Sequence, residues 1–206
     1  MPVDSEPRVF VVDDDPAVLR AVERLLRASG LVVESFTSPA FFLTRLPYEG
    51  PACVVLDMRM PELNGLQVQG ALESTGIQTI FLSGTSDVPT AAQALRKGAV
   101  DFLVKPVDEA VLLGAISRAL AVSADSRRQQ RQEAEYKKRL ARLTKRERQV
   151  CDLVAAGMMN KQIAYELGRS ERTIKVHRAR VMQKLEVDSV AALVWLLARL
   201  VKTSVS

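Results

Sequence analysis

Acidic side chains follow directly on two apolar runs of this sequence, in a pattern suited to binding a cation and transferring a phosphoryl group. Asp13 and Asp14 come straight after the run VFVV, and Asp57 comes straight after CVVL. Two further apolar runs, TIFL and DFLV, are followed by Ser83 and Lys105. Carboxylates about 5 Å apart repel each other by about 3 kcal/mol at an effective dielectric near 20, so a partner must offset that repulsion.

These side-chain types together indicate metal-assisted phosphoryl transfer. Mg²⁺ (or Mn²⁺) would offset the repulsion, because hard cations prefer carboxylate oxygens, water and phosphate as ligands. A carboxylate beside such an ion can attack a phosphoryl group and form an aspartyl phosphate. The hydroxyl and the ammonium could then hold the remaining phosphoryl oxygens.

The apolar runs are typical of strands that alternate with helices over the first 120 residues. The expected strands are 8–12, 31–36, 52–56, 79–82 and 101–104, and the expected helices are 16–29, 39–46, 65–74, 89–98 and 108–120. Five such units predict an α/β fold, a doubly wound five-stranded parallel sheet of the flavodoxin-like kind. In that fold the carboxyl ends of the strands meet at one edge, which would gather the five polar residues into one pocket.

Charge divides the chain into an acidic first part and a basic second part. Residues 1–120 carry 10 Lys and Arg against 15 Asp and Glu, whereas residues 144–206 carry 12 against 6. The basic part could bind nucleic acid or could simply carry a solvated basic surface. With two cysteines, one histidine and no apolar run near the roughly 20 residues of a membrane span, we expect a cytoplasmic protein without disulfides or a zinc site.

The basic part is expected to contain only helices. Residues 121–143 are rich in Arg, Gln and Lys without an apolar stripe, so they form either an exposed helix continuing from the preceding one or a disordered tether. Capping patterns then predict four short helices. The expected caps are Thr144 with Glu147, Asn160, Ser170 and Ser189, and the expected helix ends include Gly157 and Gly168.

Residues 160–185 fit a helix-turn-helix. Ala164 is small where two helices would cross, and the expected core residues are Ile163, Leu167, Ile174 and Val181. On the second helix the outward side chains are expected to be Arg172, Val176, Ala179 and Gln183, flanked by Lys175 and Arg180. Such a basic helix suits the major groove of double-stranded DNA.

The first part resembles the receiver domain of bacterial two-component response regulators, through the motifs VVDDDP, LDMRMPELNG, FLSGTSDVP and GAVDFLVKP. The resemblance implies that Asp57 is the phosphoacceptor and that Lys105 and Ser83 bind the phosphoryl group. It implies a metal bound by the carboxylates of Asp14 and Asp57, the backbone carbonyl of Arg59 and, through water, Asp13. It also implies that Phe102 swings inward on activation and that Lys105–Pro106 is a cis peptide bond.

The second part resembles the LuxR-type DNA-binding domain, and the whole chain resembles a FixJ/NarL-type regulator. The motifs are LTKRERQV, NKQIAYELGRSERTIKVHRARVMQKL and DSVAALVWLLARL. Lys175 and Val176 are implied as base contacts, although relatives often carry a larger polar residue at Ala179. The candidate DNA-binding residues are Arg172, Thr173, Lys175, Val176, His177, Ala179 and Arg180. The last helix is implied in dimerisation through Val190, Leu193, Val194 and Leu197, with packing inside the domain as the alternative.

The expected organisation is a receiver at 7–121, a linker at 122–141 and a DNA-binding domain at 142–206. The expected function is phosphorylation of Asp57 by a sensor histidine kinase, then homodimerisation and binding of promoter DNA to regulate transcription. Activation, with RNA polymerase as a further partner, is favoured over repression. An alternative is a phosphohydrolase, but such enzymes usually carry a second Asp where this chain has Arg59, so no enzyme is expected. DNA binding without phosphorylation is the other alternative.

Overall fold

The polypeptide folds into two units, Met1–Arg128 and Gln129–Ser206. The computed structural model describes residues 6–84 and 88–202. Within those ranges no helix combines the length and the apolar character needed to cross a membrane.

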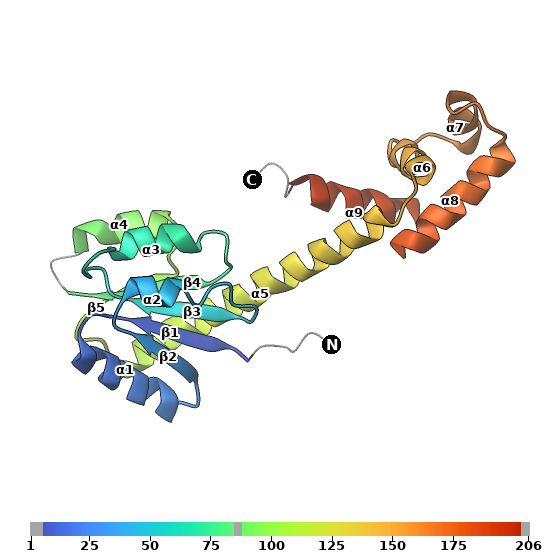
Figure 1. Cartoon of the computed structure of the whole chain (residues 1–206). Helices are drawn as coiled ribbons and strands as arrows, with labels where there is room; N and C mark the ends of the chain where they lie inside the picture. The colour runs from blue at the N-terminus through green and yellow to red at the C-terminus, as the bar shows by residue number, and fades with distance from the viewer. Residues whose placement is uncertain (1–5, 85–87, 203–206) are drawn as a thin grey trace. The chain divides into compact units, whose positions relative to one another are not determined.

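The first unit is a parallel sheet covered by helices on both faces, as predicted. The strand order is β2-β1-β3-β4-β5 and every pairing is parallel. The strands are β1 (Arg8–Val12), β2 (Val32–Phe36), β3 (Ala52–Leu56), β4 (Gln78–Ser83) and β5 (Asp101–Val104). The helices are α1 (Pro16–Ala28), α2 (Pro39–Leu43), α3 (Gly65–Leu72), α4 (Val88–Arg96) and α5 (Glu109–Ala141). Figure 1 shows α1 and α5 on one face of the sheet and α2, α3 and α4 on the other.

Strand β1 shows why its sequence lacks polar alternation. Val9 and Val11 pack into the core beneath α1 and α5, whereas Phe10 and Val12 pack into the core beneath α2 and α3. All four side chains are buried, because a strand with helices on both faces has no solvent side. Helix α1 begins after Asp15, whose side chain accepts a hydrogen bond from the N–H of Ala17, so this carboxylate caps a helix.

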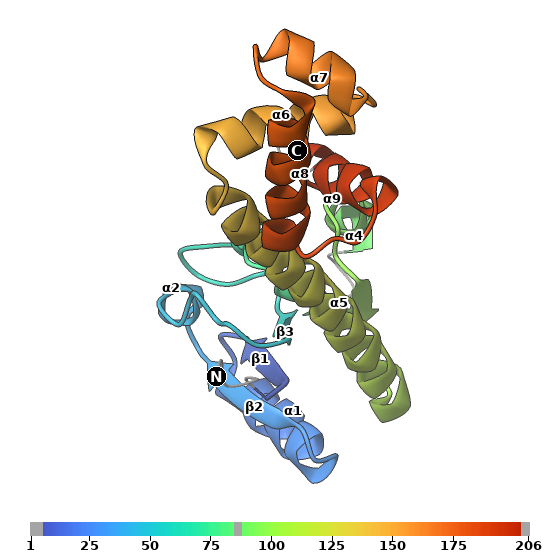
Figure 2. The same cartoon turned by 90° about the vertical axis from the view of Figure 1, so that its right-hand side faces the viewer.

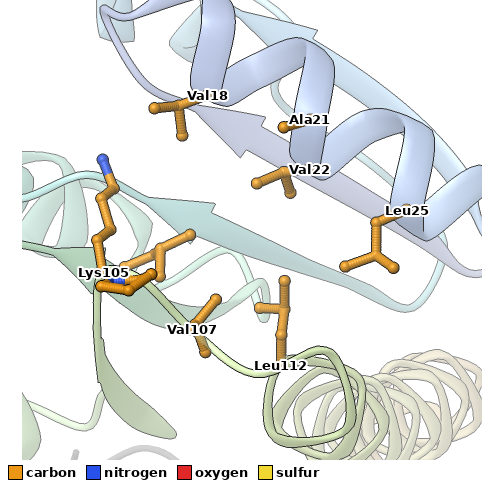
Figure 3. Close-up of a pocket in the computed structure, with 9 residues that line it drawn as sticks. Val18, Ala21, Val22, Leu25, Lys105, Val107 and Leu112 are labelled. Carbon is orange, nitrogen blue, oxygen red and sulfur yellow. The ribbon is translucent and has the colours of Figure 1, made fainter.

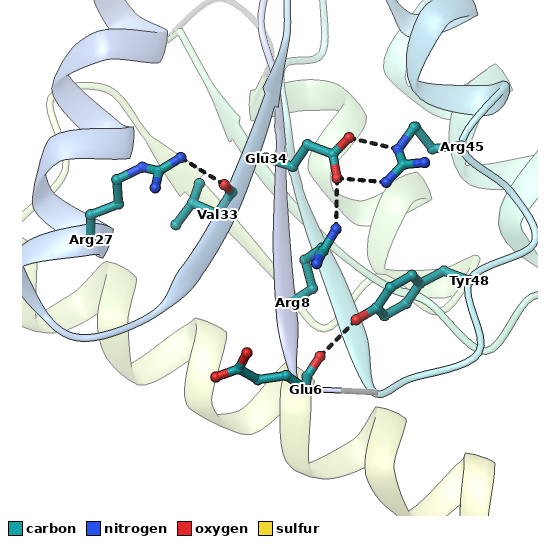
Figure 4. Close-up of polar contacts among 7 residues, drawn as sticks. All are labelled: Glu6, Arg8, Arg27, Val33, Glu34, Arg45 and Tyr48. Carbon is teal, nitrogen blue, oxygen red and sulfur yellow. Dashed lines mark hydrogen bonds and ion pairs between the residues drawn. The ribbon is translucent and has the colours of Figure 1, made fainter. Parts of the chain in front are cut away.

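The edge strand β2 is covered by a polar network rather than left bare (Figure 4). Glu34 accepts hydrogen bonds from Arg8 at 2.9 Å and from Arg45 at 2.6 Å. Hydrogen bonding from Arg45, and then from Arg8, lowers the pKa of Glu34 below its usual value. Tyr48 donates to the carbonyl of Glu6 nearby. Charged side chains along an edge strand discourage its pairing with other chains.

Helix α5 is unbroken from Glu109 to Ala141, so the segment 122–141 is helical, as expected from its composition, and the tether alternative is wrong. Ser123 is fully buried in the first unit, where its hydroxyl accepts from the N–H of Ala52 at 3.0 Å and donates to the carbonyl of Gly76 at 2.8 Å. One turn later Arg127 donates to the carbonyl of Tyr48. The first part of the predicted linker is therefore hydrogen-bonded to the receiver unit.

The second unit contains α6 (Lys145–Ala155), α7 (Asn160–Glu166), α8 (Glu171–Leu185) and α9 (Val190–Lys202). Thr144 and Glu147 form the predicted capping box, and Ser170 caps α8. The cap predicted at Asn160 is wrong. Met159 is the N-cap of α7, its N–H donates to Gln162, and the side chain of Asn160 accepts from Arg178 at 3.1 Å instead.

Candidate functional site

The carboxyl ends of β1, β3 and β5 bring three of the predicted pocket residues into direct contact. Lys105 follows β5, and its Nζ donates to Asp13 Oδ2 at 2.5 Å and to Asp57 Oδ1 at 2.7 Å. These residues are 92 and 48 positions apart in the sequence. The predicted gathering of an acidic pair and a lysine at one sheet edge is therefore confirmed for these three side chains.

Both carboxylates of this pair are held by backbone donors as well. Asp57 Oδ2 accepts from the N–H of Arg59 at 2.6 Å, and Asp13 Oδ1 accepts from the N–H of Asp15 at 2.9 Å. Burial raises the pKa of Asp57 despite the opposing bonds from Lys105 and Arg59. Burial alone would lower the pKa of Lys105, but its bonds to the two carboxylates raise it. The lysine ammonium therefore offsets the carboxylate repulsion in this structure.

The acidic pair of Asp13 and Asp57 is the candidate metal site. Asp13 and Asp57 are buried, whereas Asp14, which follows Asp13 in the chain, is exposed to solvent. Throughout residues 6–84 and 88–202, no three His, Cys, Asp or Glu side chains cluster as ligands of one ion. The donor chemistry still fits Mg²⁺, since two carboxylates already share one cation and a third follows directly. The predicted ligand set, which includes the Arg59 carbonyl, stays a prediction.

The two predicted switch residues, Ser83 and Phe102, lie on the neighbouring strands β4 and β5. Ser83 ends β4 and is buried, and its carbonyl accepts from the N–H of Lys105 at 2.8 Å. Phe102 on β5 is half-buried, with its ring 6.0 Å from that of Phe81. Part of the FLSGTSDVP motif, residues 85–87, lies outside the described residues. The Lys105–Pro106 bond is cis, as the resemblance implied.

An apolar hollow of about 330 Å³ borders the acidic pair, and sequence reasoning missed it. Figure 3 shows its lining from α1 on one side and from the segment after β5 on the other, with Lys105 at one end. Its lining residues are Val18, Ala21, Val22, Leu25, Leu82, Lys105, Pro106, Val107 and Leu112. Val18 and Leu25 are only partly buried, so the apolar stripe of α1 extends beyond what the core covers.

Helix α8 presents the predicted basic face. Ile174 and Val181 are buried in the second core, as expected, and Leu185 is buried there as well. The predicted outward residues are all exposed, namely Arg172, Lys175, Val176, Ala179, Arg180 and Gln183. Thr173 is half-buried, and its N–H donates to Ser170. His177 is half-buried, and its Nδ1 has no hydrogen-bond partner within the described part of the chain.

The predicted dimerisation stripe on α9 is only partly available. Leu193 is fully buried in the core of its own unit, which corrects its assignment as a dimer contact. Val190 and Leu197 are half-buried and pack against the same core. Val194 is exposed, and so is Trp195, over which the guanidinium of Arg199 lies at 4.8 Å. The apolar face of α9 packs inward, because the four short helices of this unit share one core.

The sequence matches two family models, one for each unit. The response regulator receiver domain matches residues 9–117, and the luxR family of bacterial regulatory proteins matches residues 141–197. The chain is 44% identical over 199 residues to the response regulator protein TodT of Pseudomonas putida, covering 96% of this chain and 88% of TodT. The chain belongs to the FixJ-type response regulators. The transcriptional regulatory protein FixJ of Azorhizobium caulinodans is 43% identical to this response regulator, over 90% of this chain and 89% of that protein.

Solved structures agree with the fold of this response regulator. The response regulator StyR has a TM-score of 0.85 and 43% identity, with 95% of this chain and all of that chain covered. Full-length FixJ from B. japonicum has a TM-score of 0.57 and 36% identity, with 94% of this chain and 96% of that chain covered. The relatives are named as response and transcriptional regulators, which agrees with the expectation that the chain is not an enzyme.

Gly65 allows α3 to start close to Asp57, the predicted phosphoacceptor of this response regulator. A Cβ at this position would lie 2.7 Å from the carbonyl oxygen of Asp57 and 2.7 Å from the ring of Phe81. We expect Gly65→Ala to destabilise the receiver unit by about 2 kcal/mol, because overpacking a rigid site typically costs 1–3 kcal/mol. Urea unfolding followed by circular dichroism measures the effect.

Gly70 on the same helix is the matched control, because a Cβ there would meet no atom within 4 Å. Gly70→Ala should be neutral or stabilising by up to about 1 kcal/mol, as expected for Ala in place of Gly inside a helix. Equal effects of the two substitutions would contradict the close-approach explanation.

Proposed function

We propose that Asp57 accepts a phosphoryl group from the phosphohistidine of a sensor histidine kinase, and that the phosphorylated chain dimerises and binds promoter DNA. The observation that carries this proposal is the ammonium of Lys105, shared between Asp13 and Asp57 at the carboxyl edge of the sheet. In the transfer an Asp57 carboxylate oxygen bonds to phosphorus, the phosphorus–nitrogen bond breaks, and the histidine leaves with the electron pair.

The residues around Asp57 have separate roles in this transfer. Asp13, Asp14, Asp57 and the Arg59 carbonyl would hold Mg²⁺ or Mn²⁺, which when bound neutralises charge on the phosphoryl oxygens. The N–H of Arg59 orients the Asp57 carboxylate through its bond to Oδ2. Lys105 exchanges its bond to Asp57 for a phosphoryl oxygen, and Ser83 donates to another. Phe102 then moves inward beside Ser83, which changes the surface at β4 and β5.

The apolar hollow beside Lys105 is the proposed docking place of the kinase. A donor histidine must approach Asp57 from outside, and this hollow shares Lys105 with the acidic pair (Figure 3). Three exposed arginines, Arg20, Arg24 and Arg27, lie along the adjacent outer face of α1. An apolar centre with a charged rim is the usual anatomy of a transient protein interface.

Helix α8 is the proposed DNA-recognition helix. Lys175 and Val176 would meet base edges, while Arg172 and Arg180 would meet phosphates. His177, half-buried on the same helix, would add a contact to a phosphate oxygen. The exposed residues Val194 and Trp195 of α9 are available for the dimer. We propose activation of transcription, with RNA polymerase as a further partner.

The decisive experiment measures DNA affinity with and without a phosphoryl donor. The full chain would select duplexes from a random pool, and its affinity for them would be compared before and after treatment with acetyl phosphate and Mg²⁺. We expect tighter binding after treatment, together with a shift from monomer to dimer. Equal affinity in both states would favour DNA binding without phosphorylation.

The salt dependence of binding reports the phosphate contacts of α8. Arg180 is exposed on the basic face, so Arg180→Gln should weaken binding to all sequences alike and reduce the slope of log affinity against log salt by about 0.9. Lys175→Gln should instead relax sequence preference, with a loss of about 1–3 kcal/mol on selected sites. Fluorescence anisotropy at several salt concentrations measures both.

Arg24→Gln in the receiver serves as the charge-matched control for these measurements, because Arg24 is an exposed arginine outside the DNA-binding unit. For Arg24→Gln, the slope of log DNA affinity against log salt should equal that of the wild type. An unchanged slope in Arg180→Gln as well would remove Arg180 from the DNA interface.

A further inference from the structure

The recognition helix α8 ends in an unusual way. Glu186 follows its last residue with φ +55°, in the left-handed region that glycine normally occupies after a helix. A side chain with a Cβ adopts that conformation at a cost in free energy. Glu186 therefore needs an interaction that offsets the cost.

Arg139, on the last turn of α5, supplies that interaction. Its Nη2 lies 2.9 Å from Glu186 Oε2, and its Nη1 donates to the carbonyl of Leu185 at 3.4 Å. The Leu185 carbonyl is one of the unpaired acceptors at the negative end of the α8 dipole. Two side chains of α5 itself orient this guanidinium. Its Nε lies 3.3 Å from Glu135 Oε1, and its Cζ lies 5.9 Å from the centre of the Tyr136 ring. Arg139 thus binds both the backbone and the side chain that close α8.

A second contact holds the same end of α8. Lys184 donates to the carbonyl of Arg142 at 3.2 Å and to Glu147 at 2.6 Å. Arg142 is the residue directly after α5, and Glu147 lies in the first turn of α6. The end of α5 and the start of α6 therefore both contact the final turn of α8.

The other end of α5 is hydrogen-bonded to the receiver unit through Ser123 and Arg127, and the helix is unbroken between these residues and Arg139 (Figure 2). We propose that Arg139 is a positioning residue for DNA recognition, which couples α5 to α8 so that the phosphorylation state of the receiver changes how α8 engages DNA. This inference rests on the proposed role of α8 in DNA binding.

Two substitutions in the full chain test the coupling. Arg139→Gln removes the guanidinium, and Glu186→Gly removes its carboxylate partner while accepting φ +55° without strain. The readout is the ratio of DNA affinities with and without acetyl phosphate, measured on duplexes that the wild type selects. Coupled sites typically show ratios of about 5–150, and we expect both variants to fall below about twofold. Phosphorylation of Asp57 and the melting temperature are recorded in parallel.

Arg128→Gln is the matched control, because Arg128 lies on the same helix, is mostly exposed and pairs with Asp125. It should keep the wild-type ratio. If Arg139→Gln fails to fold, Glu186→Gly decides the outcome alone. The proposed role of Arg139 is wrong if variants that fold and are phosphorylated keep the wild-type ratio of DNA affinities. It is also wrong if the variants change only the melting temperature. A wild-type chain that binds no duplex at all would instead refute the proposed function.

Discussion

Asp57→Asn is expected to abolish phosphorylation of this response regulator by acetyl phosphate, and with it the phosphorylation-driven dimer. The amide has no carboxylate oxygen to attack phosphorus, and its nitrogen cannot replace that nucleophile. The fold should survive, because burial already raises the pKa of Asp57 and so disfavours its charged form. Phosphate-affinity electrophoresis measures the modification, and sedimentation velocity measures the dimer.

Asp15→Asn is the control for this result. Asp15 is a neighbouring acidic residue, but its side chain caps α1 and the asparagine can do the same. The control should be phosphorylated and should dimerise like the wild type. Undiminished dimerisation of Asp57→Asn in the presence of acetyl phosphate would remove the phosphorylation step from the proposed function.

Lys184→Met is expected to lower the free energy of unfolding of the DNA-binding unit by about 3 kcal/mol. Glu147 is buried, and Lys184 pairs with it at 2.6 Å, so the substitution leaves a buried carboxylate without its cation. Breaking a buried pair in this way typically costs 3–5 kcal/mol, and partial exposure of Lys184 places this case at the lower end. Urea unfolding followed by the fluorescence of Trp195, the single tryptophan of the chain, reports on this unit.

Adding Glu147→Gln to Lys184→Met should recover most of the loss. The glutamine is neutral, and it can still accept from the N–H of Thr144 in the capping box, as Glu147 does at 2.8 Å. A double variant no more stable than Lys184→Met would mean that the unpaired charge is not the cause.

The same pair makes stability depend on pH. The bond from Lys184, followed by the bond from the Thr144 N–H, lowers the pKa of Glu147 from 4.5 to about 2. Because the folded-state pKa lies below the unfolded value, this contribution is complete above about pH 4.5 and is lost as the pH falls toward 2. The double variant should lack this acid-dependent loss when unfolding is measured between these two pH values.

Local sequence patterns were enough to predict the elements and most of the receiver pocket. The segments VFVV and CVVL were predicted to be buried strands because every residue in them is apolar. Both faces of the sheet are indeed covered by helices. Asp13, Asp57 and Lys105 could be grouped because parallel strands place their carboxyl ends at one edge. The outward face of α8 followed from helical periodicity in the same way.

Contacts between distant elements could not be predicted in this way. Leu193 has the spacing of a dimer contact and of a core residue alike, and only the packing of α9 against α6 shows that it is buried. Asn160 has a favourable capping side chain, but Arg178 on the next helix competes for it. The role of Lys105 as the counter-charge of both carboxylates also emerged only when three strand ends were placed in space.

The sequence by itself determined the fold class and the family, because periodicity and short motifs act within a few residues of one another. The tertiary structure decided which apolar residues face a core and which face outward. It also decided where α5 meets the end of α8, since Arg139 and Glu186 are joined by side chains whose positions depend on the packing of three helices. Such long-range pairings leave no periodic trace in one sequence.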